Sequence, residues 1–312
     1  MIGCNVSLLI FSFMGLYQQC LVYATEAPKS TVSIDNHAHQ LKNYADPDPS
    51  IRWEELGFSL NGVETDFIWL DRVRVPDTYN QLQDDKNDKL STLYSSDSTT
   101  CLRRLSTTRI SLHPAATVLN YGQSLFEGVK AFRRQDGSIV IFRPSENAFR
   151  LERGAERLLM PVVPLDTFLE AITQVVRANA RFIPPAGKGA LYLRPLLFGS
   201  GPGLGVKPST ETTFCIYCSP VGNYFKGGLK CIKLQAVRGY SRAAKGGSGN
   251  IKAGGNYAPP FAIQKDVRQR GFDEALFLDA ARYDVFFLDV QFIISFIVLK
   301  FTSLSLMITI YD

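Results

Sequence analysis

The chain has 312 residues, of which 46% are hydrophobic and 20% charged, and its formal net charge is +5 at pH 7. This length and composition predict a globular protein with a substantial buried core and exclude an intrinsically disordered chain. The positive charge is small and scattered, so it provides no surface for nucleic acid. Six cysteines are too few for a disulfide scaffold in a chain of this length, and we expect free thiols.

The two ends of the chain differ in composition from its middle. Residues 1–45 form an N-terminal extension whose apolar run is typical of a targeting segment but has no basic start. His37 and His39 lie in this extension without further ligands nearby, so we assign no metal site. Residues 282–312 form an apolar tail, but Lys300 and many β-branched and hydroxyl residues disfavour a membrane helix.

Residues 46–219 alternate between strand and helix patterns and predict an N-terminal α/β domain. Residues 72–110 are polar and aperiodic, which predicts an inserted surface loop. The run GSIVIFRP after the turn RQDG predicts the second strand of a hairpin. Amphipathic helices are expected over 145–160, with Ser145 as N-cap, and over 164–182, with Asp166 as N-cap.

Three further strands are expected in the second half of the chain, over residues 189–201, 212–222 and 229–237. The second of them contains Cys215 and Cys218, and its apolar, β-branched composition favours a buried strand over a redox or zinc site. The glycine-rich run GSGPGLGV is not followed by a helix pattern, which argues against a phosphate loop. Proline and glycine cluster at 220–228 and predict a linker to a second domain.

Lys252 stands in the glycine-rich stretch GNIKAGGNYA. On spacing alone this lysine is more typical of a solvated turn than of a reactive group. Pyridoxal phosphate chemistry, however, requires a lysine amine for the cofactor's aldehyde, an anion site for its phosphate, and a hydroxyl near its ring oxygen. Lys252, the neighbouring glycines and Tyr257 are the residue types that two of these requirements need.

Four segments together resemble successive signatures of the branched-chain amino acid aminotransferases, the plant enzymes in particular. They are YGQSLFEGVKAFRRQDGSIVIFRPSENAFRLERGAERLLMP, GKGALYLRPLLFGSGPGLGV, YCSPVGNYFKGG and GNIKAGGNYA. The resemblance covers about residues 46–69 and 111–281. It implies an α/β fold of two domains, of the class IV aminotransferase type, in which residues 229–281 would be part of the cofactor-binding domain.

The resemblance also implies roles for single residues. Lys252 matches the lysine that bonds to pyridoxal 5'-phosphate, Tyr257 the tyrosine at the ring oxygen, and Arg150 the phosphate-binding arginine. The residues that would contact substrates or the partner subunit are Tyr121 and Arg194 at the substrate carboxylate, Phe126, Tyr192 and Phe58 as pocket walls, Leu204 and Val206 in a loop reaching the partner's pocket, and Tyr224 in the mobile interdomain loop.

The implied reaction is a ping-pong transfer of the amino group from leucine, isoleucine or valine to 2-oxoglutarate, which yields glutamate and a branched 2-oxo acid. An aromatic pocket with few polar groups suits these side chains. The resemblance further implies a homodimer in a plastid or mitochondrion, although residues 1–45 are poor in arginine and a cytoplasmic location is the alternative.

The resemblance ends after ALFLDAA. Phe287 and Leu288 stand where the family has a glutamate opposite the pyridine nitrogen, and Asp289 is the nearest carboxylate. We therefore expect an incomplete second domain, and the alternative function is a catalytically inactive, truncated relative that at most dimerises. D-amino acid aminotransferase and aminodeoxychorismate lyase share the fold, but the segments LYLRPLLFGSGPGLGV and GNYFKGG follow the branched-chain pattern.

Overall fold

The computed structural model describes residues 44–58, 63–74, 101–222 and 233–278, together with the strands at 285–288 and 309–311. The N-terminal targeting segment, His37 and His39, most of the predicted insertion, and Asp289 lie outside the described residues. Tyr224 and the predicted linker beyond Gly222 also lie outside them, and the division into two domains stays a prediction.

A seven-stranded sheet with the order β2-β1-β7-β6-β4-β5 forms the larger layer, and a seventh strand, β3, pairs with β6. All of its pairings are antiparallel. The strands are β1 (Phe67–Arg74), β2 (Leu102–Arg104), β3 (Ser124–Phe126), β4 (Val129–Arg133), β5 (Ile139–Ile141), β6 (Ala190–Gly199) and β7 (Glu211–Val221). The two longest, β6 and β7, are buried along almost their whole length, as their continuous apolar runs predict.

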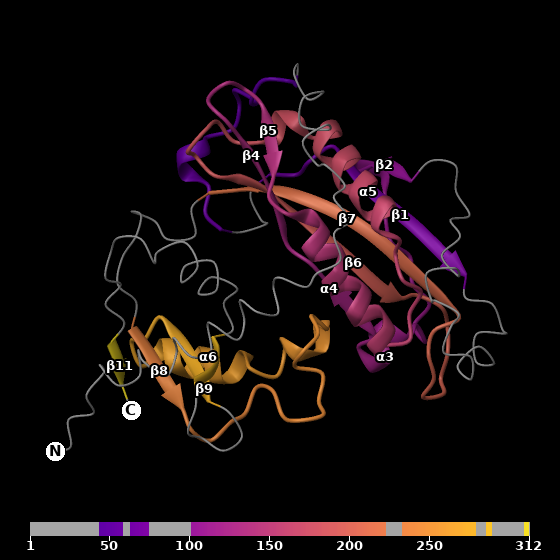
Figure 1. Ribbon diagram of the computed structural model, residues 1–312, viewed down its shortest axis with the longest axis vertical. Coiled ribbons are helices and arrows are strands. Elements are labelled where there is room, and N and C mark those ends of the chain that lie inside the picture. Colours follow the sequence, from indigo (N-terminus) through magenta and orange to yellow (C-terminus); the bar gives the residue numbers. More distant parts are fainter. Residues whose placement is uncertain are drawn as a thin grey trace, which may run out of the picture. The chain divides into compact units, whose positions relative to one another are not determined.

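Two helices, α4 (Pro144–Arg157) and α5 (Leu165–Ala178), pack against each other and against the sheet (Figure 1). The apolar residues of α5 recur at helical spacing and are buried against β1 and β7; they are Phe168, Ala171, Ile172, Val175 and Val176. Gly154 brings α4 close to β3, because a Cβ at this position would lie 2.6 Å from Cδ2 of Leu125. This close approach places the preceding turn of α4 beside the segment that follows β3.

Both helices begin earlier than their predicted caps. The N-cap of α4 is Arg143, in a left-handed conformation with φ of 44°, so Ser145 lies inside the first turn and does not cap the helix. The N-cap of α5 is Pro164, and Asp166 is likewise a residue of the first turn. The fixed φ of proline favours helix starts, which explains the shift in α4, where Pro144 is the first residue.

The hairpin of β4 and β5 is confirmed, with Gly137 at φ of 81° in its turn. The surface loop predicted over residues 72–110 includes strand residues near both of its ends. Its first residues, 72–74, continue β1 and pair with β7, while Leu102–Arg104 form β2 along the other edge of β1. Backbone hydrogen bonds to neighbouring strands therefore form β-structure in a segment whose polar composition is typical of a loop.

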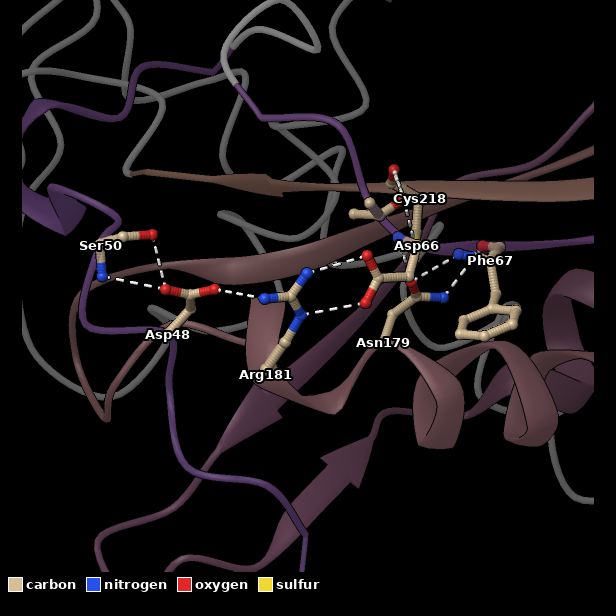
Figure 2. Close-up of polar contacts among 8 residues, drawn as sticks. Asp48, Ser50, Asp66, Phe67, Asn179, Arg181 and Cys218 are labelled. Atoms are coloured by element: carbon tan, nitrogen blue, oxygen red, sulfur yellow. Dashed lines mark hydrogen bonds and ion pairs between the residues drawn. The ribbon is translucent and has the colours of Figure 1, made fainter. Parts of the chain in front are cut away.

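A network of polar side chains attaches the segment around Asp48 to the start of strand β1, as Figure 2 shows. Arg181 donates from Nη1 to Asp48, at 2.7 Å, and from Nε and Nη2 to the two oxygens of Asp66, at 3.0 and 2.9 Å. Next to it, the buried side chain of Asn179 makes four hydrogen bonds to the backbone, two of them accepted from the amides of Asp66 and Phe67. These hydrogen bonds hold Asp66 and Phe67, where β1 begins, against residues 179–181.

Cys215 and Cys218 lie in β7 and are both buried and free. Burial raises the pKa of each thiol to about 12, so neither is a ready nucleophile or metal ligand. The prediction of a buried strand here is confirmed. The run GSGPGLGV follows β6 and leads into β7 rather than into a helix, as expected.

A second sheet has the order β10-β9-β8-β11 and is covered on β9 by α6 (Phe261–Gln269). Its strands are β8 (Lys233–Val237), β9 (Glu274–Leu278), β10 (Val285–Leu288) and β11 (Thr309–Tyr311). The strand β8 runs parallel to β9 and β11, and β10 runs antiparallel to β9. Among the described residues, no helix combines the length and hydropathy that a membrane crossing needs.

Candidate active site

Lys252 is buried, with 8% of its surface exposed, so the solvated-turn interpretation of this lysine is wrong. Its carbonyl accepts a hydrogen bond from the amide of Phe126, at 3.2 Å, and its neighbour Ala253 forms a β-bridge to Leu125. The loop thus docks onto β3. Gly254 permits this contact, because a Cβ there would lie 2.4 Å from Oγ of Ser124.

Asn256 braces the loop from inside. Its side-chain nitrogen donates to the carbonyls of Ser248 and Ile251, at 2.8 and 3.0 Å, while its oxygen accepts from the hydroxyl of Ser248 at 2.6 Å. The glycines allow the tight course of the loop, and the asparagine fixes it. As a result, the side chain of Lys252 has a defined direction.

The amine of Lys252 donates to the hydroxyl of Tyr257 at 3.0 Å and lies 4.4 Å from the ring centroid of Phe126. Burial lowers the pKa of this amine to about 8, from its ordinary value of 10.5. Arg150, Arg194 and Arg242 lower it further, and the carboxylate of Glu127 opposes them. A sizeable fraction of the amine is therefore neutral, and nucleophilic, near physiological pH.

The predicted pocket walls form a continuous chain of contacts with this lysine. The rings of Phe126 and Tyr257 meet edge to face at 4.8 Å, and those of Phe58 and Tyr192 at 5.7 Å. Arg194 joins the two pairs, since its guanidinium lies over the rings of Phe126 and Tyr192, at 4.6 and 5.3 Å. The structure thus brings together six of the predicted site residues, with Lys252 at one end.

Arg194 also has a hydrogen-bond donor for which the described residues provide no acceptor. Its Nη2 donates to the hydroxyl of Tyr192 at 3.1 Å, but its buried Nε has no hydrogen-bond partner among the described residues. Buried donors without a partner are rare and costly, and they indicate a missing acceptor.

Arg150 lies on α4, as predicted, but in an ion pair that the sequence did not reveal. Its Nε and Nη2 donate to the two carboxylate oxygens of Glu127, each at 2.6 Å. Glu127 is fully buried between β3 and β4. A carboxylate between the apolar residues Phe126 and Val129 of two strand-like runs was the signal that could have identified it.

Lys130 was also missed. It is the residue of β4 that pairs with Tyr192 of β6, and its Nζ lies 5.3 Å from the ring centroid of Phe58. Burial lowers the pKa of Lys130. Two basic side chains therefore lie over the aromatic pocket walls, Lys130 over Phe58 and Arg194 over Phe126 and Tyr192.

The remaining predicted residues take no part in this chain of contacts or lie outside the described residues. Tyr121 donates to the carbonyl of Leu204, at 2.5 Å, which connects the end of α3 (Thr117–Tyr121) to the loop between β6 and β7. Leu204 and Val206 are 83% and 92% exposed. Within the described part of the chain, no hydrogen bond or ring contact joins these three residues to Lys252, and Tyr224 lies outside it.

Comparisons with known proteins show which proteins the chain is similar to. The family model described as amino-transferase class IV matches residues 124–285, which is more than half of the chain. The chain is 43% identical over 239 residues to branched-chain-amino-acid aminotransferase 2, chloroplastic, of Arabidopsis thaliana, with 77% of this chain and 55% of the relative covered. It is 50% identical over 171 residues to branched-chain amino acid aminotransferase 1, mitochondrial, of Humulus lupulus, with 55% and 44% covered.

Among solved structures, the branched-chain amino acid aminotransferase of Escherichia coli matches with a TM-score of 0.51 and 26% identity, covering 70% of this chain and 61% of that one. The expected α/β fold of the class IV type is thereby confirmed. The chain spans about half the length of the curated relatives it matches. On the family model and the sequence identity together, the chain belongs to the class IV aminotransferase family.

Proposed function

We propose that this protein is a branched-chain amino acid aminotransferase that uses pyridoxal 5'-phosphate. The observation that carries the proposal is the position of Lys252, a buried amine 3.0 Å from the hydroxyl of Tyr257 and against the ring of Phe126. Relatives at 43% and 50% identity carry the name of this activity.

The described residues fit the cofactor. Lys252 presents a partly neutral amine to an aldehyde, Tyr257 offers a hydroxyl beside it, and Arg150 offers a guanidinium to a phosphate. When bound, pyridoxal phosphate supplies an electron sink that stabilises negative charge at Cα of the amino acid and carries the amino group between the two substrates.

Lys252 would also act as the base of the reaction. Its amine would remove the proton from Cα of the amino acid and return a proton later in the cycle. A pKa of about 8 suits this role, because general bases act best when their pKa lies near the operating pH. The hydroxyl of Tyr257, at 3.0 Å, keeps the amine oriented between these events.

The pocket accounts for a preference for leucine, isoleucine and valine. The rings of Phe58, Phe126 and Tyr192 offer apolar surface to a branched side chain. The guanidinium of Arg194, whose Nε has no hydrogen-bond partner among the described residues, would attract a substrate carboxylate, and 2-oxoglutarate would bring a second one. D-amino acid aminotransferase and aminodeoxychorismate lyase activity are disfavoured by the segments LYLRPLLFGSGPGLGV and GNYFKGG, which follow the branched-chain pattern.

The proposal includes a homodimer in a plastid or mitochondrion. Leu204 and Val206 are apolar side chains held out from the loop between β6 and β7, where the partner subunit would cover them. The relatives named above are described as chloroplastic and mitochondrial, respectively.

The position of the family's glutamate is the strongest argument for the alternative, an inactive relative. Phe287 and Leu288 belong to β10, which pairs with Phe277 and Leu276 of β9, so an apolar strand occupies that part of the chain. Without a carboxylate at the ring nitrogen the electron sink is weaker. Cofactor binding and amino transfer must therefore be tested separately.

The test is a visible absorbance spectrum of the purified chain with added pyridoxal phosphate. We expect a band that is present in the Lys245→Ala variant, in which an exposed lysine of the neighbouring loop is removed, and absent in Lys252→Ala. Loss of the band on adding leucine, but not D-alanine, supports the aminotransferase. A band that leucine leaves unchanged supports the inactive alternative, and no band in the unaltered chain refutes the proposal.

A further inference from the structure

The ion pair of Glu127 and Arg150 places a carboxylate in the protein core, where burying a charge opposes folding. Glu127 is fully buried, and removing a carboxylate from water is costly even when a cation compensates it. Apolar residues of similar volume usually stabilise a fold as well or better. A pair of this kind is therefore poorly explained by stability alone, and its geometry points to another use.

The geometry holds the guanidinium in one orientation. Nε and Nη2 of Arg150 each contact one carboxylate oxygen of Glu127 at 2.6 Å, which is the two-point arrangement that fixes a planar guanidinium. The carboxylate is itself fixed, because Nδ2 of Asn147, one turn earlier on α4, donates to its Oε2 at 2.8 Å. Arg150 thus cannot rotate without breaking two charged hydrogen bonds.

The opposite edge of the guanidinium remains available. The side chain of Arg150 is 39% exposed, and its Nη1 makes no hydrogen bond to any described residue. The pair also lies beside the reactive lysine. Phe126, which immediately precedes Glu127, contacts the amine of Lys252, and both charges of the pair act on that amine.

We propose that Glu127 is a positioning residue, which fixes the guanidinium of Arg150 so that its open Nη1 edge receives the phosphate of the cofactor. This inference rests on the proposed function, because it presupposes that Arg150 is the phosphate ligand. It adds that affinity for the phosphate depends on a carboxylate that does not touch the cofactor. Removing this negative charge should then weaken, and not strengthen, the binding of an anion.

The test compares two aldehydes that differ only in the phosphate, pyridoxal 5'-phosphate and pyridoxal. Their dissociation constants are measured from the Lys252-dependent absorbance band for the unaltered chain and for Glu127→Gln. The matched control is Glu146→Gln, which removes an exposed carboxylate from the first turn of the same helix. The ratio of the two constants isolates the contribution of the phosphate from that of the lysine and the ring.

We expect Glu127→Gln to reduce the preference for the phosphorylated aldehyde by at least about tenfold, the effect of one charge-assisted hydrogen bond. Its constant for pyridoxal and the ratio in Glu146→Gln should stay close to those of the unaltered chain. A purely structural role would instead weaken both aldehydes alike. An unchanged preference, or a parallel loss of both affinities, would overturn the proposal.

A second variant covers the case in which Glu127→Gln does not fold. Arg150→Lys keeps the positive charge opposite Glu127 but cannot be held at two points. The proposal predicts a similar loss of phosphate preference in this variant, and full retention would overturn it. Failure of the proposed function is distinguishable, because the unaltered chain would then bind neither aldehyde through Lys252.

Discussion

The lowered pKa of Lys252 predicts a dependence of stability on pH that is independent of catalysis. In the ligand-free chain this amine titrates near 8, whereas in the unfolded chain it titrates near 10.5. Between these values the unfolded chain binds a proton that the folded chain does not. Folding therefore becomes more favourable as pH rises from about 8 towards 10.5, and the burial of a charged lysine opposes folding below pH 8.

The size of the effect follows from this difference. At about 1.4 kcal/mol for each tenfold change in proton affinity, charging Lys252 costs the folded chain about 3 kcal/mol at pH 7. Most of this cost, roughly 2–3 kcal/mol, disappears by pH 10. The Lys252→Met variant has no such charge, so its advantage in unfolding free energy over the unaltered chain should shrink by that amount between pH 7 and pH 10.

Urea unfolding of the ligand-free proteins at several pH values measures this change, and the control is Lys245→Met, which removes an exposed lysine of the neighbouring loop. Other side chains that titrate over this range cancel, since they are common to both proteins. A difference between Lys252→Met and the unaltered chain that stays constant from pH 7 to pH 10 would refute the lowered pKa. The explanation of why Lys252 is reactive would then be lost as well.

Three further predictions concern neighbouring features. In Gly128→Ala the new Cβ would lie 2.3 Å from the hydroxyl of Tyr192, so the ring must move, and we expect KM for leucine to rise about tenfold in steady-state assays, with thermal stability little changed. Asn179→Ala removes the four hydrogen bonds of a buried side chain and should lower the free energy of unfolding by about 2–4 kcal/mol in urea titrations. A loss below about 0.5 kcal/mol would contradict the role of Asn179 in holding the start of β1. Cys215 and Cys218 should resist a thiol reagent at pH 8 until the chain is unfolded, because burial raises the pKa of both to about 12; rapid labelling of the folded protein would contradict this.

The sequence determined the periodic elements and the family. Strands β6 and β7 and helix α5 follow directly from apolar runs and helical spacing, because these patterns specify which faces must leave water. Helix starts were less well predicted, since Pro144 and Pro164 override the capping preference of Ser145 and Asp166. The four signature segments sufficed for the family, because their order and spacing carry far more information than any one motif.

The resemblance named most of the site residues, but only the tertiary structure decided which of them are in contact and in what chemical state. The local sequence around Lys252 is typical of a turn. Its docking against β3, which buries the amine and lowers the pKa of that amine, depends on residues far away in the sequence. Glu127 and Arg150 are 23 residues apart, and their pairing depends on the close packing of α4 against β3 at Gly154. Contacts between distant segments and the loss of water around a charge are properties of the folded chain, and no local pattern of residues encodes them.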